Sequence, residues 1–295
     1  MELLGQQVIN GLTIGAVYGI FAIGFNLVFG TLNILNLAQG SIATVGALAA
    51  VWAADALGAG FYLALILGVA AGALVGGLVD ELAFRPIRVR GGSPLAFIIT
   101  SLGFWLVLDS LALVTTDARA LVLPDTGLED VSVSFGSVLL RLENVAIILT
   151  FVVLAVGVHQ ILGRTRQGAA IRAVGWDQRS AAISGVNSRV VFVGTAAAAG
   201  ALCGLAGIAY GVTTNSVTWD LGSSLLLYGF AAVVVGGFGD VRGAALGGVL
   251  IGLSQVLSAQ YVSGSFRDVI TFGLLIMFLL FRPIGIFGRS TGIRA

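Results

Sequence analysis

Residues 164–189 read RTRQGAAIRAVGWDQRSAAISGVNSR and separate two long apolar runs of the chain. This segment carries five arginines and a single acidic residue, Asp177. Arginine-rich loops between membrane spans stay on the cytoplasmic side. We expect Asp177 to cap the N-terminus of a short helix over residues 178–184, and Gly185 to end that helix. The stretch therefore predicts a membrane protein with an ordered helix at its cytoplasmic surface, where a soluble partner can dock.

The composition indicates a protein that lies largely within a membrane. Hydrophobic residues make up 58% of the 295 residues and charged residues only 10%, whereas a soluble chain has roughly a quarter of its residues charged. The 43 glycines let membrane helices approach one another closely. We therefore expect an all-α, polytopic transmembrane bundle, with residues 1–295 forming one transmembrane domain and no soluble domain.

The apolar runs predict about eight to nine spans, since a helix needs roughly 20 apolar residues to cross the hydrocarbon core. The predicted spans are residues 8–30, 38–54, 61–82, 95–115, 144–163, 190–213, 225–238, 244–262 and 267–282. The seventh is short, which predicts that it is tilted, broken or re-entrant. Seven crossings, with 225–262 as a re-entrant hairpin, would leave the same loops on the same sides.

The arginines predict the orientation of the chain in the membrane. With these spans, twelve arginines fall on the side of residues 164–189 and three fall on the other side, namely Arg119, Arg141 and Arg267. The side with more arginine is normally cytoplasmic. This bias predicts an extracytoplasmic N-terminus and a cytoplasmic C-terminus.

Several chemistries are excluded by what the chain lacks. It has no lysine, a single histidine (His159) and a single cysteine (Cys203). It therefore has no phosphate-binding lysine of a nucleotide site, no lysine for a Schiff base and no histidine–cysteine cluster for a metal. No basic patch interleaved with aromatic residues suggests nucleic acid. We expect no cofactor and no bound metal, and an energy source outside this chain.

Two segments, residues 29–47 and 235–252, interrupt the apolar pattern with glycines and a few polar residues. Interrupted helices at membrane depth occur where the backbone is buried or lines a wet cavity, and in transporters they mark the substrate route. In the first segment the candidate path residues are Asn33, Asn36, Gln39 and Ser41. The sequence leaves open whether they line a path or form a turn, and likewise whether the second segment is a turn or has a docking or gating role.

One carboxylate, Asp109, falls within a predicted span. An intramembrane acid is a functional candidate by default. It either pairs with a neighbouring helix or the interface, or it relays protons. Three polar residues in other spans, Tyr18, Asn26 and Gln255, are expected to form hydrogen bonds between helices.

The chain resembles the permease subunits of bacterial ABC importers for branched-chain, hydrophobic amino acids. The resemblance runs in order over nearly the whole chain. It rests on GLTIGAVYGIFAIGFNLVFGTLNILNLAQGSIATVGA (11–47), ELAFRPIRVRGGSPLAFIITSLG (81–103), GRTRQGAAIRAVGWDQRSAAISGVNSRVVFV (163–193), AAVVVGGFGDVRGAALGGVLIGLSQ (231–255) and FRPIGIFG (281–288).

The resemblance implies a subunit of a larger importer in the bacterial inner membrane. Its expected partners are a second permease subunit, two cytoplasmic ATPase subunits and an extracytoplasmic solute-binding protein, all acting within or at the lipid bilayer. The implied ATPase-coupling residues are Asp177, Arg179, Ala181, Ala182 and Gly185. They match the family's EAA-like loop incompletely, because Ser180 stands in place of its glutamate and the spacing to the glycine is shorter.

The resemblance implies ATP-driven import by alternating access, with no enzymatic activity in this chain. An alternative is an ATPase-independent channel or facilitator for a small neutral solute. A membrane enzyme is the weakest hypothesis, since the sequence offers almost no histidine or cysteine and no paired intramembrane acids.

Overall fold

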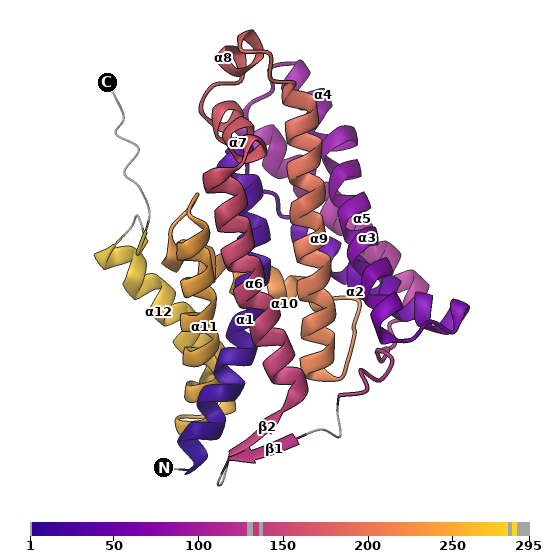
Figure 1. The fold of residues 1–295 in the computed structure, drawn as a ribbon, viewed down its shortest axis with the longest axis vertical. Coiled ribbons are helices and arrows are strands. Elements are labelled where there is room, and N and C mark those ends of the chain that lie inside the picture. The colour runs from indigo at the N-terminus through magenta and orange to yellow at the C-terminus, as the bar shows by residue number, and fades with distance from the viewer. Residues whose placement is uncertain (1, 129–131, 136–137, 283–284, 288–295) are drawn as a thin grey trace.

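The computed structural model describes residues 2–128, 132–135, 138–282 and 285–287, and it is an elongated bundle of helices (Figure 1). The helices are α1 (Glu2–Leu32), α2 (Gln39–Leu57), α3 (Phe61–Val79), α4 (Arg85–Val89), α5 (Pro94–Thr116), α6 (Leu142–Arg164), α7 (Arg166–Trp176), α8 (Gln178–Ile183), α9 (Ser188–Thr214), α10 (Leu221–Gly236), α11 (Val241–Tyr261) and α12 (Arg267–Phe281). A π-helical turn, η1 (Asp80–Phe84), joins α3 to α4, and a 3₁₀ turn, η2 (Gly264–Phe266), precedes α12. Strands β1 (Ser132–Phe135) and β2 (Val138–Arg141) pair antiparallel.

The predicted class, an all-α polytopic membrane bundle, is confirmed. Within the described residues, 7 helices are long and apolar enough to cross a membrane. Two predicted spans, 225–238 and 267–282, are instead shorter helices, because α10 has 16 residues and α12 has 15. The predicted span 61–82 ends too early, since the helical stretch continues through η1 and α4 to Val89.

Helix α1 is the centre of the bundle. Of the most apolar 18 residues of α1, 83% are buried, whereas the corresponding fractions for α5 and α6 are 17% and 11%. The largest buried side chains include three aromatic residues of α1, namely Tyr18, Phe21 and Phe25. Helices α6, α9, α10 and α11 pack on α1, and the outer faces of α5 and α6 are largely exposed.

Glycines allow the helices around α1 to pack at very short range, as the composition predicts. Gly248 and Gly252 of α11 lie against Gly19 and Gly15 of α1, and a Cβ added at Gly252 would be 2.3 Å from Gly15 Cα. Between α3 and α9, a Cβ added at Gly200 would be 2.2 Å from the carbonyl oxygen of Gly72. Only glycine fits at these crossings.

The two ends of the bundle differ in composition. One end holds α4, α7 and α8, and the N-terminus and the β1–β2 hairpin lie at the other end (Figure 1). At this N-terminal end, Leu121 and Val217 form an isolated β-bridge, and the side chain of Gln6 accepts a hydrogen bond from the backbone of Leu139. The arginines of residues 85–90 and 164–189 therefore gather at one end, opposite the N-terminus. Arg289 and Arg294, and Pro283, Ile284 and Gly288 of the 281–288 stretch, lie outside the described residues.

Candidate functional site

The loop between α6 and α9 folds into an ordered structure, which we call the connector (residues 165–187). Asp177 ends α7 and caps α8: its carboxylate accepts hydrogen bonds from the backbone of Arg179 (3.0 Å) and Ser180 (3.2 Å) and from the Ser180 hydroxyl. Gly185 follows the helix with a φ of +82°. The predicted capped helix and its glycine stop are confirmed.

The same contacts lower the pKa of Asp177. The Ser180 hydroxyl contributes most, followed by the backbone N–H groups of Arg179 and Ser180. All three donors favour the charged carboxylate, which makes the cap strongest when Asp177 is ionised.

One face of the connector is seated on the bundle. Ala181 is buried in a small apolar cluster with Val174 of α7 and Phe192 of α9. Gly175 lies directly on the end of α1, where an added Cβ would be 2.7 Å from the carbonyl oxygen of Gly30. The connector is therefore a fixed surface element, with α8 held in place through Ala181.

Two large apolar side chains of the connector are exposed to the exterior. Trp176 is 91% exposed and Ile183 is 84% exposed, while Ala182 and Arg179 are also exposed. Sequence reasoning missed Trp176 and Ile183, although two large apolar residues flanking a capped turn in an otherwise polar loop are a visible signal. Exposed apolar residues in such a position are typical of a protein-binding surface.

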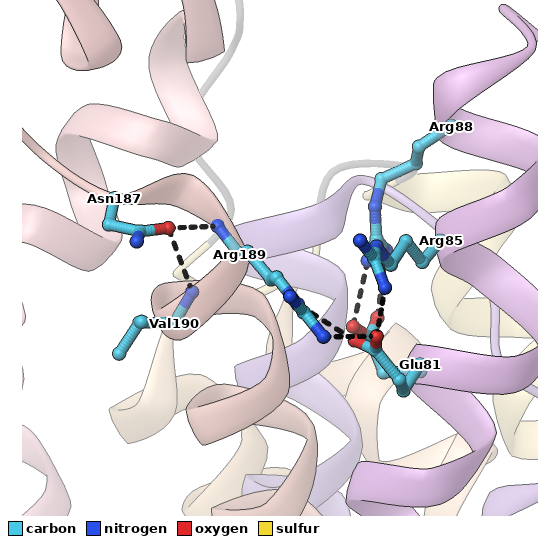
Figure 2. Close-up of polar contacts among 7 residues, drawn as sticks. Glu81, Arg85, Arg88, Asn187, Arg189 and Val190 are labelled. Carbon is cyan, nitrogen blue, oxygen red and sulfur yellow. Dashed lines mark hydrogen bonds and ion pairs between the residues drawn. The ribbon is translucent and has the colours of Figure 1, made fainter.

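A charged network joins the connector end of α9 to the end of α3 (Figure 2). Glu81 accepts hydrogen bonds from Arg189 Nη2 (2.6 Å) and Nε (3.3 Å), and it also pairs with Arg85. The side chain of Asn187 caps α9 through the backbone of Arg189 (3.1 Å) and Val190 (3.4 Å). Glu81 thus links the first turn of α9 to the helix that follows α3.

Beside Glu81, Asp80 and Arg88 form a buried ion pair. The two side chains make two parallel contacts of 2.7 Å each, and the Asp80 side chain is fully buried. The Arg88 guanidinium lies 4.3 Å from the ring centroid of Phe192. Since Phe192 also packs with Ala181, a continuous set of contacts leads from α8 through Phe192 and Arg88 to Asp80.

The ion pairs lie at a π-helical turn. In η1 the backbone is wound more loosely than in α3, and such turns are often found at functional sites. Asp80 and Glu81 are its first two residues. Although adjacent in sequence, they serve different partners, the buried Arg88 and the exposed Arg189.

The candidate path residues lie in different surroundings. Asn33 lies at the connector end of the bundle, with a φ of +51° and its side chain donating to the carbonyl of Gly175 (3.4 Å). Asn36, Gln39 and Ser41 are buried inside the bundle. The Asn36 side chain accepts from the backbone of Ala38 (3.1 Å), and Gln39 Nε2 donates to the carbonyl of Gly24 (3.4 Å).

Helix α2 begins inside the bundle, because its first residue, Gln39, contacts Gly24, which lies eight residues before the end of α1 at Leu32. Ser41 Oγ donates to Asp109 Oδ1 (2.7 Å), and Trp105 Nε1 donates to Asp109 Oδ2 (2.8 Å). Of the alternatives for Asp109, the structure contains the pairing with a neighbouring helix. A role in translocation for Asn33, Asn36, Gln39 and Ser41 stays a prediction.

Helix α10 meets the start of α2 inside the bundle. The backbone N–H of Gly222 donates to Thr44 Oγ1 (2.9 Å), and Gly222 and Gly40 are in close backbone contact. At the other end of α10, one side chain holds the turn into α11. Asn26 donates to the carbonyls of Gly237 (3.3 Å) and Asp240 (2.8 Å) and accepts from the N–H of Gly239 (2.6 Å).

The start of α10 thus lies against α2 and its end lies beside Asn26 of α1, and most of the helix is buried, so the seventh predicted span runs within the bundle. The second interrupted segment contains a helix cap: Asp240 accepts from the backbone of Arg242 (2.8 Å), while the Arg242 side chain contacts His159. Asp240 is therefore a turn residue that caps the N-terminus of α11.

A further polar group lies between α1, α11 and α12. Tyr18 donates to Gln255 Oε1 (2.7 Å), as expected of a bond between helices, and Arg267 Nη2 also reaches Gln255 Oε1 (2.6 Å). The sequence assigned Arg267 to an outer loop, but its side chain turns into the bundle. The distance along the chain between Arg267 and Tyr18 hides this contact from sequence reasoning.

A bundle of apolar spans, with a helix break at its centre and an ordered surface helix at one end, defines a multi-pass membrane permease. The chain belongs to the family of permease components of branched-chain amino acid transport systems, whose family model matches residues 7–279. It is therefore a permease subunit of a branched-chain amino-acid ABC import system, a transport component rather than an enzyme.

Several characterised relatives are similar over nearly their full length. The high-affinity branched-chain amino acid transport system permease protein BraD of Pseudomonas aeruginosa is 30% identical, over 96% of this chain and 95% of BraD. LivH of Salmonella typhimurium, with the same description, is 29% identical over 96% of this chain and 95% of LivH. The ribose import permease protein RbsC of Haemophilus influenzae is 30% identical over 92% of this chain and 83% of RbsC.

Among solved structures, PsaBC from Streptococcus pneumoniae in complex with Fab has a similar fold. The TM-score is 0.50 with 14% sequence identity, over 95% of this chain and 91% of that chain. At this identity the likeness concerns the fold alone.

Proposed function

We propose that this chain, as one transmembrane domain over residues 1–295, moves branched-chain or closely related amino acids across the bacterial inner membrane by alternating access. It pairs with a second permease subunit, two cytoplasmic ATPases drive the cycle, and an extracytoplasmic solute-binding protein delivers the amino acid. The observation that carries this proposal is the connector, whose capped helix is anchored to the bundle through Ala181 while Trp176 and Ile183 are exposed beside it.

The exposed face supports docking of an ATPase subunit. Burying a large apolar side chain stabilises a complex by about 1.5–3 kcal/mol, so a partner that covers both Trp176 and Ile183 gains from each of them. Tryptophan and arginine are also the residues that most often dominate binding energy at protein interfaces. Arg179, which is on α8 with Ile183, adds a positive charge that can pair with an acidic group of the partner.

The buried face supports transmission of movement from the ATPase into the bundle. Displacing α8 displaces Phe192 of α9 through Ala181, and Phe192 contacts the Arg88–Asp80 pair at the end of α3. Because α3 and α9 are packed glycine to glycine, they move together rather than sliding apart. The expected motion is a rigid-body shift of these helices, which opens the permease–permease interface on the opposite face.

The orientation that we propose places the connector and the C-terminus in the cytoplasm and the N-terminus outside. The support is the gathering of arginines at the connector end of the bundle, opposite the N-terminus. Docking of a cytoplasmic ATPase on the connector requires this orientation.

The proposed translocation path follows the break in the bundle, where α2 and α10 begin inside the protein. Asn33, Asn36, Gln39 and Ser41 lie along this break, and interrupted helices commonly line substrate routes. Neutral amide and hydroxyl groups suit a zwitterionic amino acid with an apolar side chain. Gln39 and Ser41 are 1% and 0% exposed, so the proposed path is closed in this conformation.

The test of this function is uptake of labelled leucine into proteoliposomes that contain the complete transporter. Uptake is expected to require internal ATP, both ATPase subunits and the solute-binding protein. Trp176→Ala is expected to weaken ATPase binding by about thirtyfold, as for a hot-spot residue worth roughly 2 kcal/mol, and to lower uptake in proportion. The matched control is Trp52→Ala on α2, which removes a tryptophan that is 39% exposed away from the connector.

Uptake by this chain without any ATPase would instead favour the alternative of a channel or facilitator. Equal ATPase binding by the Trp176→Ala and Trp52→Ala variants would show that Trp176 is not part of the site where the ATPase docks.

A further inference from the structure

A large apolar groove opens between α6 and α9, near the connector end of the bundle. Its volume is about 870 Å³. Helices α6 and α9 both pack on α1, and Leu27 of α1 contributes to the lining of the groove. Figure 1 shows α6 and α9 in front of α1, with α7 above the end of α6. The groove therefore lies along the spans and ends at the connector.

The two parts of the groove have different chemistry. Along the spans the lining is apolar, with Leu154 and Val158 of α6 and Leu202 of α9 among its residues. At the connector end the lining includes Arg166 and Gln167, the first two residues of α7. None of the described lining residues is acidic. The groove is thus apolar along most of its length and positively charged at one end.

The charge at that end has no acid to neutralise it. Arg166 is exposed and forms no salt bridge with any residue that the structure describes. Thr165 caps α7, accepting from the backbone of Gly168 (3.1 Å), and the N-terminus of this helix adds a partial positive charge near Arg166. This end of the groove is suited to a negatively charged group.

The surroundings of Gly194 show that the lining of the groove has unfilled space. A Cβ added at Gly194, in the lining, would meet no atom within 4 Å. The glycines at the packed helix crossings leave no such space. Gly194 therefore leaves room in the lining of the groove for a larger group.

We propose that this groove binds an anionic phospholipid, with its phosphate at Arg166 and an acyl chain between α6 and α9. The anionic head group of such a lipid is complementary to the positive end of the groove, and its acyl chain is complementary to the apolar part. Basic pockets between membrane helices bind the head groups of anionic lipids in this way. The bound lipid fills the gap beside α7 and so supports the connector on the face that α1 does not cover.

The test is native mass spectrometry of the purified transporter complex after incubation with phosphatidylglycerol or phosphatidylcholine. Wild type is expected to retain phosphatidylglycerol in preference to phosphatidylcholine. Arg166→Gln is expected to weaken phosphatidylglycerol binding by about fivefold, the effect of losing roughly 1 kcal/mol for one basic residue. The matched control, Arg119→Gln, removes the same charge at the opposite end of the bundle and is expected to bind as wild type.

A second pair of variants tests the apolar part of the groove. Gly194→Leu is expected to fill the space between α6 and α9 and to reduce retention of both lipids. Its control is Gly157→Leu on α6, where an added Cβ also meets no atom within 4 Å but which does not line the groove. Size-exclusion profiles of the complexes separate lost lipid binding from failure to assemble.

Three results would each overturn the proposal. The first is equal retention of the two lipids by wild type, and the second is equal lipid binding by each variant and its control. The third is a photocrosslinker at position 194 that captures the second permease subunit instead of lipid, which would make the groove a subunit interface.

Discussion

At the scale of single residues, the Asp80–Arg88 ion pair is the most buried of the described salt bridges. A buried ion pair adds little stability relative to apolar residues of the same shape, but removing one partner leaves the other charge buried and uncompensated. Asp80 has no exposed surface, and the Arg88 side chain is only 14% exposed. The pair therefore fixes how the end of α3 is oriented toward Phe192.

We predict that Asp80→Asn destabilises the protein by about 3–5 kcal/mol, the usual cost of breaking a buried pair. Thermal unfolding of the detergent-purified protein measures the loss. The double variant Asp80→Asn with Arg88→Gln is expected to recover part of this stability, because no buried charge then remains. A double variant less stable than Asp80→Asn alone would contradict this account.

Asp177 makes the capping of α8 dependent on pH. Its pKa in the folded protein lies below the ordinary value of 3.8, so the stabilising effect of the cap is fully present above that value. The effect is lost as the pH falls through the lower, folded-state pKa.

We therefore predict that the connector is insensitive to pH in the physiological range and loosens only below the ordinary aspartate range. The measurement is the emission of Trp176, which adjoins Asp177, in a variant whose other tryptophans are phenylalanine. Asp177→Asn, which keeps a capping side chain without the charge, is expected to abolish the transition. A transition near neutral pH in the Asp177 protein would refute the prediction.

At the scale of elements, the crossing of α3 and α9 is set by glycine contacts. Gly72 and Gly200 bring the two backbones together, and any side chain at Gly200 would overlap the carbonyl of Gly72. In a membrane, close van der Waals packing of this kind is the main force between helices. The crossing holds the helix before η1 against the helix that carries Phe192.

We predict that Gly200→Leu separates α3 from α9, with a cost of at least the roughly 1–3 kcal/mol typical of overpacking. Thermal unfolding and uptake in proteoliposomes are both expected to fall. Gly103→Leu on α5, where an added Cβ meets no atom within 4 Å, serves as the control for a larger side chain in a span. Equal stability of the two variants would show that the crossing tolerates separation.

At the scale of the whole molecule, the proposed function depends on which end faces the cytoplasm. The arginine distribution predicts the answer, and the structure shows only that the connector and the N-terminus are at opposite ends. The lone native cysteine, Cys203, is fully buried, and burial raises the barrier to its reaction with reagents in water. Introduced cysteines can therefore be labelled in the native background.

We predict that Ser184→Cys, at the end of α8, reacts with a membrane-impermeant maleimide only in inside-out vesicles. Ala120→Cys, in the loop after α5, is expected to react only in intact cells or right-side-out vesicles. Both residues are exposed, so whether the reagent reaches them depends on the side of the membrane on which they lie and not on their burial. The reverse pattern would contradict both the orientation and the docking of a cytoplasmic ATPase on the connector.

The sequence by itself determined the features that depend on local order along the chain. Apolar runs of sufficient length predict spans wherever they occur, and Asp177 and Gly185 bound α8 through contacts within a few residues. Glycine content predicted close packing, and the motifs of the chain indicated its family. Seven of the nine predicted spans and the capping of α8 were predicted correctly because span formation and helix capping need no knowledge of distant partners.

The tertiary structure alone decided which residues meet across the bundle. Arg267 joins Tyr18 across 249 positions of sequence, and Asn26 holds a turn more than 200 positions away. The start of α2 inside the protein, the course of α10 and the exposure of Trp176 likewise follow from how the helices assemble. Such contacts depend on helix crossings that each involve many residues, so no short stretch of sequence specifies them.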